Sequence, residues 1–146
     1  MTTATPHKEH ADMHPILQTL TAQADEFVSI RRDIHRHPEL GFQEFRTSDL
    51  VAQCLTQWGY EVARGLGGTG VVGQLRRGDG NKRLGLRADM DALPIQEATG
   101  LDHASRNEGV MHACGHDGHT AMLLAAAHYL CLLYTSDAAD EGLGVD

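Results

Sequence analysis

Residues 112–119 read His-Ala-Cys-Gly-His-Asp-Gly-His, and a run of helix formers, Thr-Ala-Met-Leu-Leu-Ala-Ala-Ala-His-Tyr-Leu, follows at 120–130. Alanine, leucine and methionine favour helix, and because nearly every face of the run is apolar, it predicts a buried helix. The histidines, cysteine and aspartate before it are residue types that bind divalent metals such as zinc, manganese and cobalt. The sequence therefore places a candidate metal-binding turn at the start of a buried helix.

Within this turn, Cys114 and His116 are separated by one glycine, which lets the backbone fold tightly enough for both side chains to reach one ion. His112 and His119 flank the pair and could be ligands, hydrogen-bond donors to ligands, or substrate contacts. Asp117 could belong to the site or could only cap the following helix, because an aspartate there satisfies a free backbone N–H. Each residue taken alone has a structural explanation, and the cluster as a whole indicates metal binding.

A pair of carboxylates, Asp89 and Asp91, lies directly after a strand-like segment. This is the position at which α/β proteins carry reactive side chains, and the alternation of a strand would direct both to the same side. One such carboxylate could orient a histidine ligand through its ring N–H. An Asp-x-Asp pattern alone is weak, so the hypothesis depends on the nearby histidines and cysteine.

Two amphipathic helices are predicted upstream. From Pro15 onward, apolar residues recur at helical intervals as far as His37-Pro38, which ends the first helix. A second helix is predicted at 48–58, because its apolar residues fall on one face and Gly59 supplies the stop. Residues 1–14 are polar and without periodicity, which predicts a mobile tail.

Three strand-like segments follow the second helix, separated by glycine-rich turns, and two of them could pair as a hairpin. Beyond the last segment, a long loop with little periodicity leads to the metal-binding turn. Helices before and after short strands indicate an α/β fold of three layers, with the sheet in the middle. The predicted strands are 60–63, 70–76 and 83–89, and the predicted loop is 90–113.

Charge and composition argue against several kinds of partner. The 146 residues carry a formal net charge of −8 and no run of lysine or arginine, which argues against nucleic acid. No apolar stretch is long enough to span a bilayer, and residues 1–14 lack the layout of a signal peptide, so we expect a cytoplasmic protein without a membrane partner. Three cysteines without paired spacing argue against a disulfide framework.

Four segments carry a resemblance to a known family. They read RRDIHRHPELGF at 31–42, GTGVV at 68–72, LRADMDALPI at 86–95 and MHACGHDGHT at 111–120. In order and spacing, the chain resembles the amidohydrolase branch of the aminoacylase/carboxypeptidase metallopeptidases, which includes hippurate hydrolases and auxin-conjugate hydrolases. The resemblance extends over about residues 16–130, and its last segment is highly specific.

The resemblance implies the N-terminal part of a three-layer α/β/α catalytic domain of the zinc-exopeptidase type. It implies a hydrolase that cleaves the amide of small N-acyl amino acids with two divalent ions, manganese, zinc or cobalt. By resemblance, Cys114 and His116 are metal ligands and Asp91 supports the metal site. His112, His119, Asp89 and Asp117 are then candidates for substrate contacts or for groups that orient the ligands.

The family's general base is a glutamate in a Glu-Glu-Gly type segment well after the position of His119, and no such segment occurs in these 146 residues. The remaining ligands, and a small lid domain that often mediates dimerisation, would also lie beyond them. We therefore expect residues 15–130 to form a partial catalytic domain that is inactive alone, while its full-length parent could be a homodimer. Residues 131–146 resemble a translated sequencing adapter, and we expect them to be non-native.

Two other functions fit the same residues. His112, Cys114, His116 and His119 could close a structural zinc site in a non-enzymatic metal-binding module, although their spacing is tighter than in a zinc finger. Alternatively, Cys114 could be a nucleophile with a neighbouring histidine as base.

Overall fold

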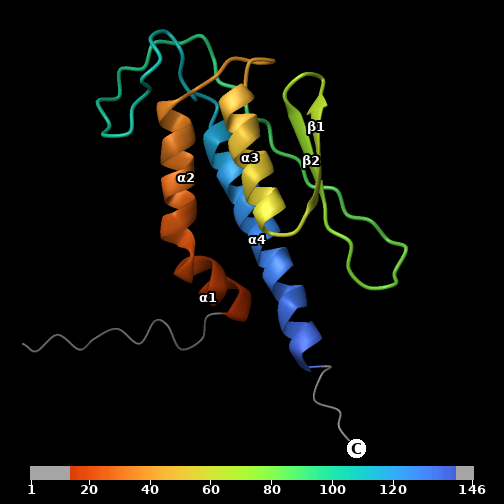
Figure 1. Cartoon of the computed structure of the whole chain (residues 1–146). Helices are drawn as coiled ribbons and strands as arrows, with labels where there is room; N and C mark the ends of the chain where they lie inside the picture. The colour runs from red at the N-terminus through yellow and green to blue at the C-terminus, as the bar shows by residue number, and fades with distance from the viewer. Residues whose placement is uncertain (1–13, 141–146) are drawn as a thin grey trace, which may run out of the picture.

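A computed structural model describes residues 14–140 of the chain, and the side chains of residues 14–133 (Figure 1). Helices dominate it, and one β-hairpin lies between the third and fourth helix in the sequence. The order of elements is α1 (Pro15–Ala22), α2 (Ala24–Arg36), α3 (Phe45–Gln57), β1 (Glu61–Leu66), β2 (Gly70–Gln74) and α4 (His116–Asp140). The expected mobile tail lies outside the described residues except for His14, whose ring accepts a hydrogen bond from the N–H of Ile16 at the start of α1.

The single helix predicted from Pro15 is two helices. Gln23, with φ −101° and ψ 0°, interrupts it, and its N–H bonds the carbonyls of Leu20 and Thr21 in a tight turn. The prediction of one continuous helix is wrong. The spacing of apolar residues indicates which face of a helix is buried, but it does not indicate where the helix axis breaks. The break leaves α1 without a buried residue, whereas α2 buries Phe27 and Ile34.

The second predicted helix is confirmed as α3, but it begins at Phe45 and not at 48. The reason is a capping contact from outside the helix. The Glu39 carboxylate accepts hydrogen bonds of 2.9 Å from the backbone N–H groups of Arg46 and Thr47 and from the Thr47 hydroxyl. These N–H groups have no partner within a helix, so a carboxylate at this end extends α3 by a turn.

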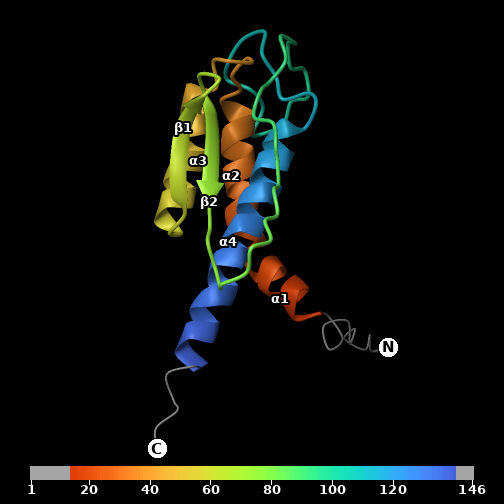
Figure 2. The ribbon, with the colours of Figure 1, turned by 90° about the vertical axis from the view of Figure 1, so that its right-hand side faces the viewer.

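β1 and β2 form an antiparallel hairpin that pairs Glu61 with Gln74 and Leu66 with Gly70. Gly70 has no room for a side chain, because a Cβ atom there would lie 2.4 Å from the carbonyl oxygen of Leu66. Two of the three predicted strands are therefore confirmed, with shifted ends. The third, 83–89, is wrong: the segment is irregular (Figure 2), and Leu84 on it is 82% exposed. A strand needs a neighbouring backbone to pair with, and residues 14–140 offer this segment none.

The three longer helices and the hairpin share one core. In Figure 1, α3 lies between the hairpin and α2, and α4 passes behind it. Phe27 of α2, Leu55 of α3 and Leu124 and Ala127 of α4 form the buried cluster. Tyr60, just before β1, joins it and donates its hydroxyl to the carbonyl of Ala127 at 2.8 Å. The predicted mixed α/β class and the buried fourth helix are confirmed, and the long loop at 90–113 has no regular element.

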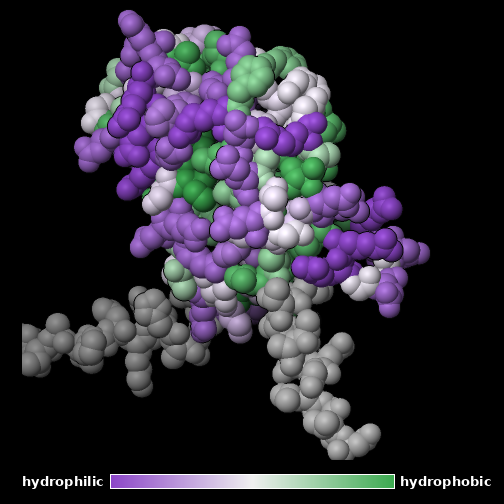
Figure 3. All heavy atoms as spheres, viewed as in Figure 1, coloured by the Kyte–Doolittle hydropathy of each residue, from purple (hydrophilic) through white to green (hydrophobic). Residues whose placement is uncertain are grey.

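The surface is mostly hydrophilic, with apolar patches between the elements (Figure 3). Apolar side chains of α4 and of the irregular segment, including Met122 and Leu86, contribute to the exposed apolar area. In the part of the chain that the structure describes, no helix combines the length and hydrophobicity needed to cross a bilayer.

We predict that Leu124→Ala destabilises the chain by about 2–5 kcal/mol, because the side chain is buried at the centre of the cluster and its removal leaves a cavity. Met122→Ala, two residues away on an exposed face of α4, is the matched control and should change stability by less than about 0.5 kcal/mol. Urea unfolding followed by circular dichroism measures both. Equal effects of the two substitutions would contradict this assignment of the core.

Candidate metal centre

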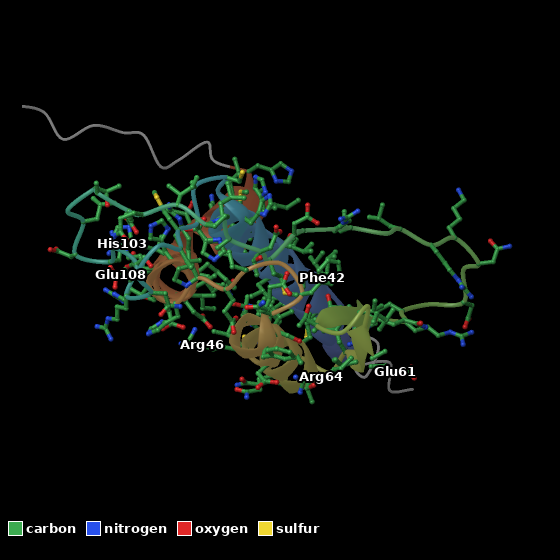
Figure 4. All side chains as sticks on the ribbon, turned by 90° about the horizontal axis from the view of Figure 1, so that it is seen from above. Phe42, Arg46, Glu61, Arg64, His103 and Glu108 are labelled. Carbon is green, nitrogen blue, oxygen red and sulfur yellow. The ribbon has the colours of Figure 1, made fainter. Side chains whose placement is uncertain are left out.

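The candidate centre lies where the loop after α2, the long loop before α4 and the first turn of α4 come together. Figure 4 looks onto this end, with Phe42 marking the first loop and His103 and Glu108 the second. Gly115 directly precedes α4 and has φ +83°, a left-handed conformation that glycine adopts without strain. This turn places His116 as the first residue of α4, and the N–H of His119 closes the turn onto the carbonyl of Gly115 at 3.0 Å.

His116 is oriented by Asp91. Its Nδ1 lies 2.9 Å from the Asp91 carboxylate oxygen Oδ1 and 3.0 Å from the Asp91 carbonyl oxygen. Both partners accept hydrogen bonds, so Nδ1 carries the proton and donates it. In the neutral ring, the lone pair is then on Nε2, which is the arrangement of a metal-binding histidine held by a carboxylate.

Backbone hydrogen bonds on both sides fix Asp91. The N–H of Ala92 donates to the carbonyl of Glu39 at 2.8 Å, and Leu93 and Met111 exchange two bonds of 2.9 and 3.0 Å. The first contact comes from the same residue that caps α3. The segment bearing Asp91 is therefore held against the loop after α2 and against the chain just before Cys114.

The loop after α2 carries a strained residue beside Asp91. A Cβ atom on Gly41 would lie 3.9 Å from the Asp91 carboxylate, and the next residue, Phe42, has φ +66°. That conformation is uncommon for a bulky side chain, and such strain persists only where the surroundings impose it. Here Glu39 bonds the start of α3 on one side, and Thr69 donates to the buried Glu44 carboxylate on the other.

The other predicted site residues are only partly brought together. The His119 ring lies near the His116 ring, with centroids 5.6 Å apart and planes tilted by 37°, and Cys114 is exposed and free. The Asp89 carboxylate pairs with Arg87, whereas the Asp91 carboxylate contacts His116, so one of the two aspartates lies against a histidine of the predicted site. The backbone carbonyl of Asp89 nevertheless accepts a bond from Thr120 at 3.1 Å and ties α4 to this segment.

His112 is buried, and neither ring nitrogen has a hydrogen-bond partner. Burial lowers the pKa of His112, and this effect outweighs the nearby Asp117 charge, which acts in the opposite direction. The ring is therefore held neutral. Because Cys114 is exposed and His112 is enclosed, these two side chains do not present one open face to a shared ion.

Asp117 points away from His116 and into the protein. It is fully buried, and its Oδ2 accepts hydrogen bonds from His35 at 2.8 Å and from Arg31 at 3.1 Å. Burial alone would raise its pKa, but the hydrogen bonds from His35 and the Gly118 N–H, with the charge of Arg31, lower it overall. The carboxylate therefore stays ionised and anchors the start of α4.

His35, Glu97 and Arg31 are the residues that sequence reasoning missed. His35 is one of the three buried residues of α2, with Phe27 and Ile34. A polar residue on a buried helical face needs a buried partner, and that was the available signal. The partners could not be named, since Asp117 lies 82 residues away and Glu97 62.

The donor set fits a metal site in its chemistry but does not complete one. A thiol and an imidazole with its Nε2 free are good ligands for zinc or manganese, and a carboxylate orients the imidazole. Across residues 14–140, however, no group of three His, Cys, Asp or Glu side chains is close enough to hold an ion. Nor does any imidazole there hydrogen-bond the Cys114 thiol, so neither the closed zinc site nor the cysteine–histidine pair is preformed.

Comparison with known proteins identifies relatives of this chain. Residues 85–142 match the peptidase family M20/M25/M40. The chain is 56% identical over 126 residues to hippurate hydrolase of Campylobacter jejuni, covering 82% of this chain and 33% of that protein. It is 45% identical over 114 residues to N-acetyl-L-cysteine deacetylase of Bacillus subtilis, covering 78% and 27%. The chain thus spans about a third of the length of the curated relatives it matches.

Solved structures give the same relation and confirm the predicted fold class. An aminohydrolase-like protein of Staphylococcus aureus superposes with a TM-score of 0.79 at 43% identity, over 85% of this chain and 33% of that one. A Bacillus subtilis protein described as a dinuclear metal binding peptidase superposes with a TM-score of 0.73 at 40% identity, over 77% and 32%. Motifs, fold and sequence identity agree: the chain belongs to peptidase family M20/M25/M40.

Proposed function

We propose that this chain provides part of the active site of a metal-dependent amidohydrolase that releases an amino acid and a carboxylic acid from an N-acyl amino acid. The observation that carries the proposal is the contact between His116 and Asp91, which leaves one imidazole nitrogen free for a ligand. The names of the relatives, a hippurate hydrolase and an N-acetyl-cysteine deacetylase, support the substrate class.

In this proposal Cys114 and His116 hold metal, and Asp91 keeps the His116 ring in the tautomer that binds it. Bound divalent ions would polarise the amide carbonyl and lower the pKa of an attacking water. One structural neighbour is described as dinuclear, which supports two ions per site, and zinc, manganese and cobalt suit these ligands. The general-base glutamate and the remaining ligands would come from residues outside this sequence.

The finer parts of the proposal rest on the resemblance. They are a small N-acyl amino acid as the partner, a cytoplasmic location, and a homodimeric full-length protein. Residues 15–130 would then be the catalytic portion, and the adapter-like residues 131–146 would contribute nothing to it.

We predict that Zn²⁺ protects Cys114 from iodoacetamide in the 146-residue chain. The exposed thiol is reactive when free, and a metal that binds it removes the attacking thiolate. Mass spectrometry of tryptic peptides measures the labelling of Cys114, with the half-buried Cys54 as an internal control that metal should not affect. His116→Gln should abolish the protection. Equal labelling with and without Zn²⁺ would contradict ligation and favour the cysteine as a nucleophile.

We also predict that the 146-residue chain does not hydrolyse hippurate in the presence of Mn²⁺, because two ligands cannot hold a catalytic ion tightly. A chimera in which residues 15–130 replace the matching third of Campylobacter jejuni hippurate hydrolase should hydrolyse it. In that chimera, Cys114→Ser or His116→Gln should lower kcat/KM by at least about 100-fold, since removing even a group that supports a ligand costs 10–100-fold.

Release of glycine measures the activity of both proteins. Cys54→Ala and His37→Gln in the chimera are matched controls, because both residues lie outside the candidate centre. Turnover by the 146-residue chain, or full activity of the Cys114→Ser chimera, would overturn the assignment.

A further inference from the structure

A buried chain of ionisable side chains links three separate parts of the fold. His35 of α2 is in the middle, with Nδ1 2.8 Å from Asp117 of α4 and Nε2 3.3 Å from Glu97 of the long loop. All three side chains are at most 5% exposed. Each ring nitrogen faces a carboxylate oxygen, so either neutral tautomer of the ring donates to one carboxylate, and the doubly protonated ring donates to both.

Glu97 is itself held in place, so the chain has a fixed end. Its Oε2 accepts the N–H of Ser105 at 2.6 Å, and its Oε1 accepts the hydroxyl of Thr99. Burial alone would raise the pKa of Glu97, but these hydrogen bonds and His35 lower it overall and keep it ionised. His35 therefore connects a rigid part of the loop to the first turn of α4.

Of the two side chains that donate to Asp117, His35 is the stronger anchor. The Arg31 side chain is 47% exposed and offers one nitrogen at 3.1 Å, so solvent screens its charge more than it screens the buried Asp117. The His35 ring is buried and closer, and it cannot change its position without leaving a buried carboxylate unpaired.

The first turn of α4 has few other restraints. Asp117 directly follows His116 in the sequence, and Thr120 gives the next contact, to the Asp89 carbonyl at 3.1 Å. We infer that His35 is a positioning residue for His116: by holding Asp117, it sets the rotation of the first turn so that the His116 ring meets Asp91. This inference rests on the proposed function in one respect only, that His116 is a ligand.

His35→Gln tests the inference in the full 146-residue chain, because one amide cannot reach both carboxylates. His37→Gln is the matched control. It makes the same change two residues further along the chain, at the end of α2, where the ring bonds the Asp33 carbonyl at 2.9 Å. The first measurement needs no metal: long-range ¹H–¹⁵N NMR identifies which nitrogen of His116 carries the proton. We expect wild type and His37→Gln to keep the proton on Nδ1 and His35→Gln to lose this single-tautomer pattern.

The second measurement is titration with Co²⁺ alone, followed by the absorption of the cobalt–thiolate bond. His35→Gln should weaken Co²⁺ binding about 10- to 100-fold, in the range seen when groups that orient ligands are removed. A purely structural role would lower the unfolding midpoint and leave both the tautomer and the Co²⁺ affinity of the folded protein unchanged. That result would overturn the inference.

The His35→Gln variant could fail to fold, and the wild type could fail to bind Co²⁺. If circular dichroism shows that His35→Gln does not fold, Glu97→Gln replaces it, because it removes the carboxylate that holds the other nitrogen of the His35 ring and so loosens the hold of that ring on Asp117; a smaller loss of the single-tautomer pattern is expected, and an unchanged pattern would contradict the inference. If wild type binds no Co²⁺, the proposed metal site fails, and the tautomer of His116 alone decides whether His35 positions it.

Discussion

Asp117 is the residue on which the geometry of the candidate centre depends. It is an ionised carboxylate with no access to solvent, placed in the first turn of α4. Removing one partner of such a buried pair typically costs about 3–5 kcal/mol, whereas an exposed pair such as Arg87 with Asp89 contributes less than about 1 kcal/mol. The position of the carboxylate near the positive end of the helix dipole adds to its stability. The start of α4 is therefore held firmly against α2, although the two helices are far apart in sequence.

The other half of the centre is held by the backbone. Glu39 uses its carboxylate to cap α3 and its carbonyl to bind the segment that carries Asp91, so one residue couples a helix end to the site. Leu93 and Met111 close the same segment against the chain that leads to Cys114. Asp91 and His116 therefore approach each other from two supports, the loop after α2 and the anchored helix, and their hydrogen bond joins them.

The sequence predicted local features well and distant partners poorly. The helix-forming run at 120–130 predicted α4, and the apolar face that ends at Gly59 predicted α3. Both predictions were possible because helix formation depends on neighbours within a few residues. The segment 83–89 has the alternation of a strand, with apolar residues at 84, 86 and 88, but a strand also needs a partner, which alternation does not supply. Asp117 could be named as a candidate site residue because it lies within the histidine and cysteine cluster. His35 could not be identified as its partner, because the two residues are far apart in the sequence. The assignment of Cys114 and His116 as ligands came from resemblance and stays a prediction.

The same contrast explains which part of the site is organised without metal. His116 has its ring fixed by Asp91 and its helix turn fixed through Asp117, so the cost of ordering this side chain is met by folding. Cys114 has no hydrogen-bond partner and an exposed thiol, so its side chain would be ordered only on binding an ion. For an ion that bound both residues, the His116 ring would already be oriented. Part of the binding free energy would be spent on ordering the Cys114 side chain. In such an arrangement, the buried groups around Asp117 would affect metal affinity through the orientation of His116, although none of them would touch the ion.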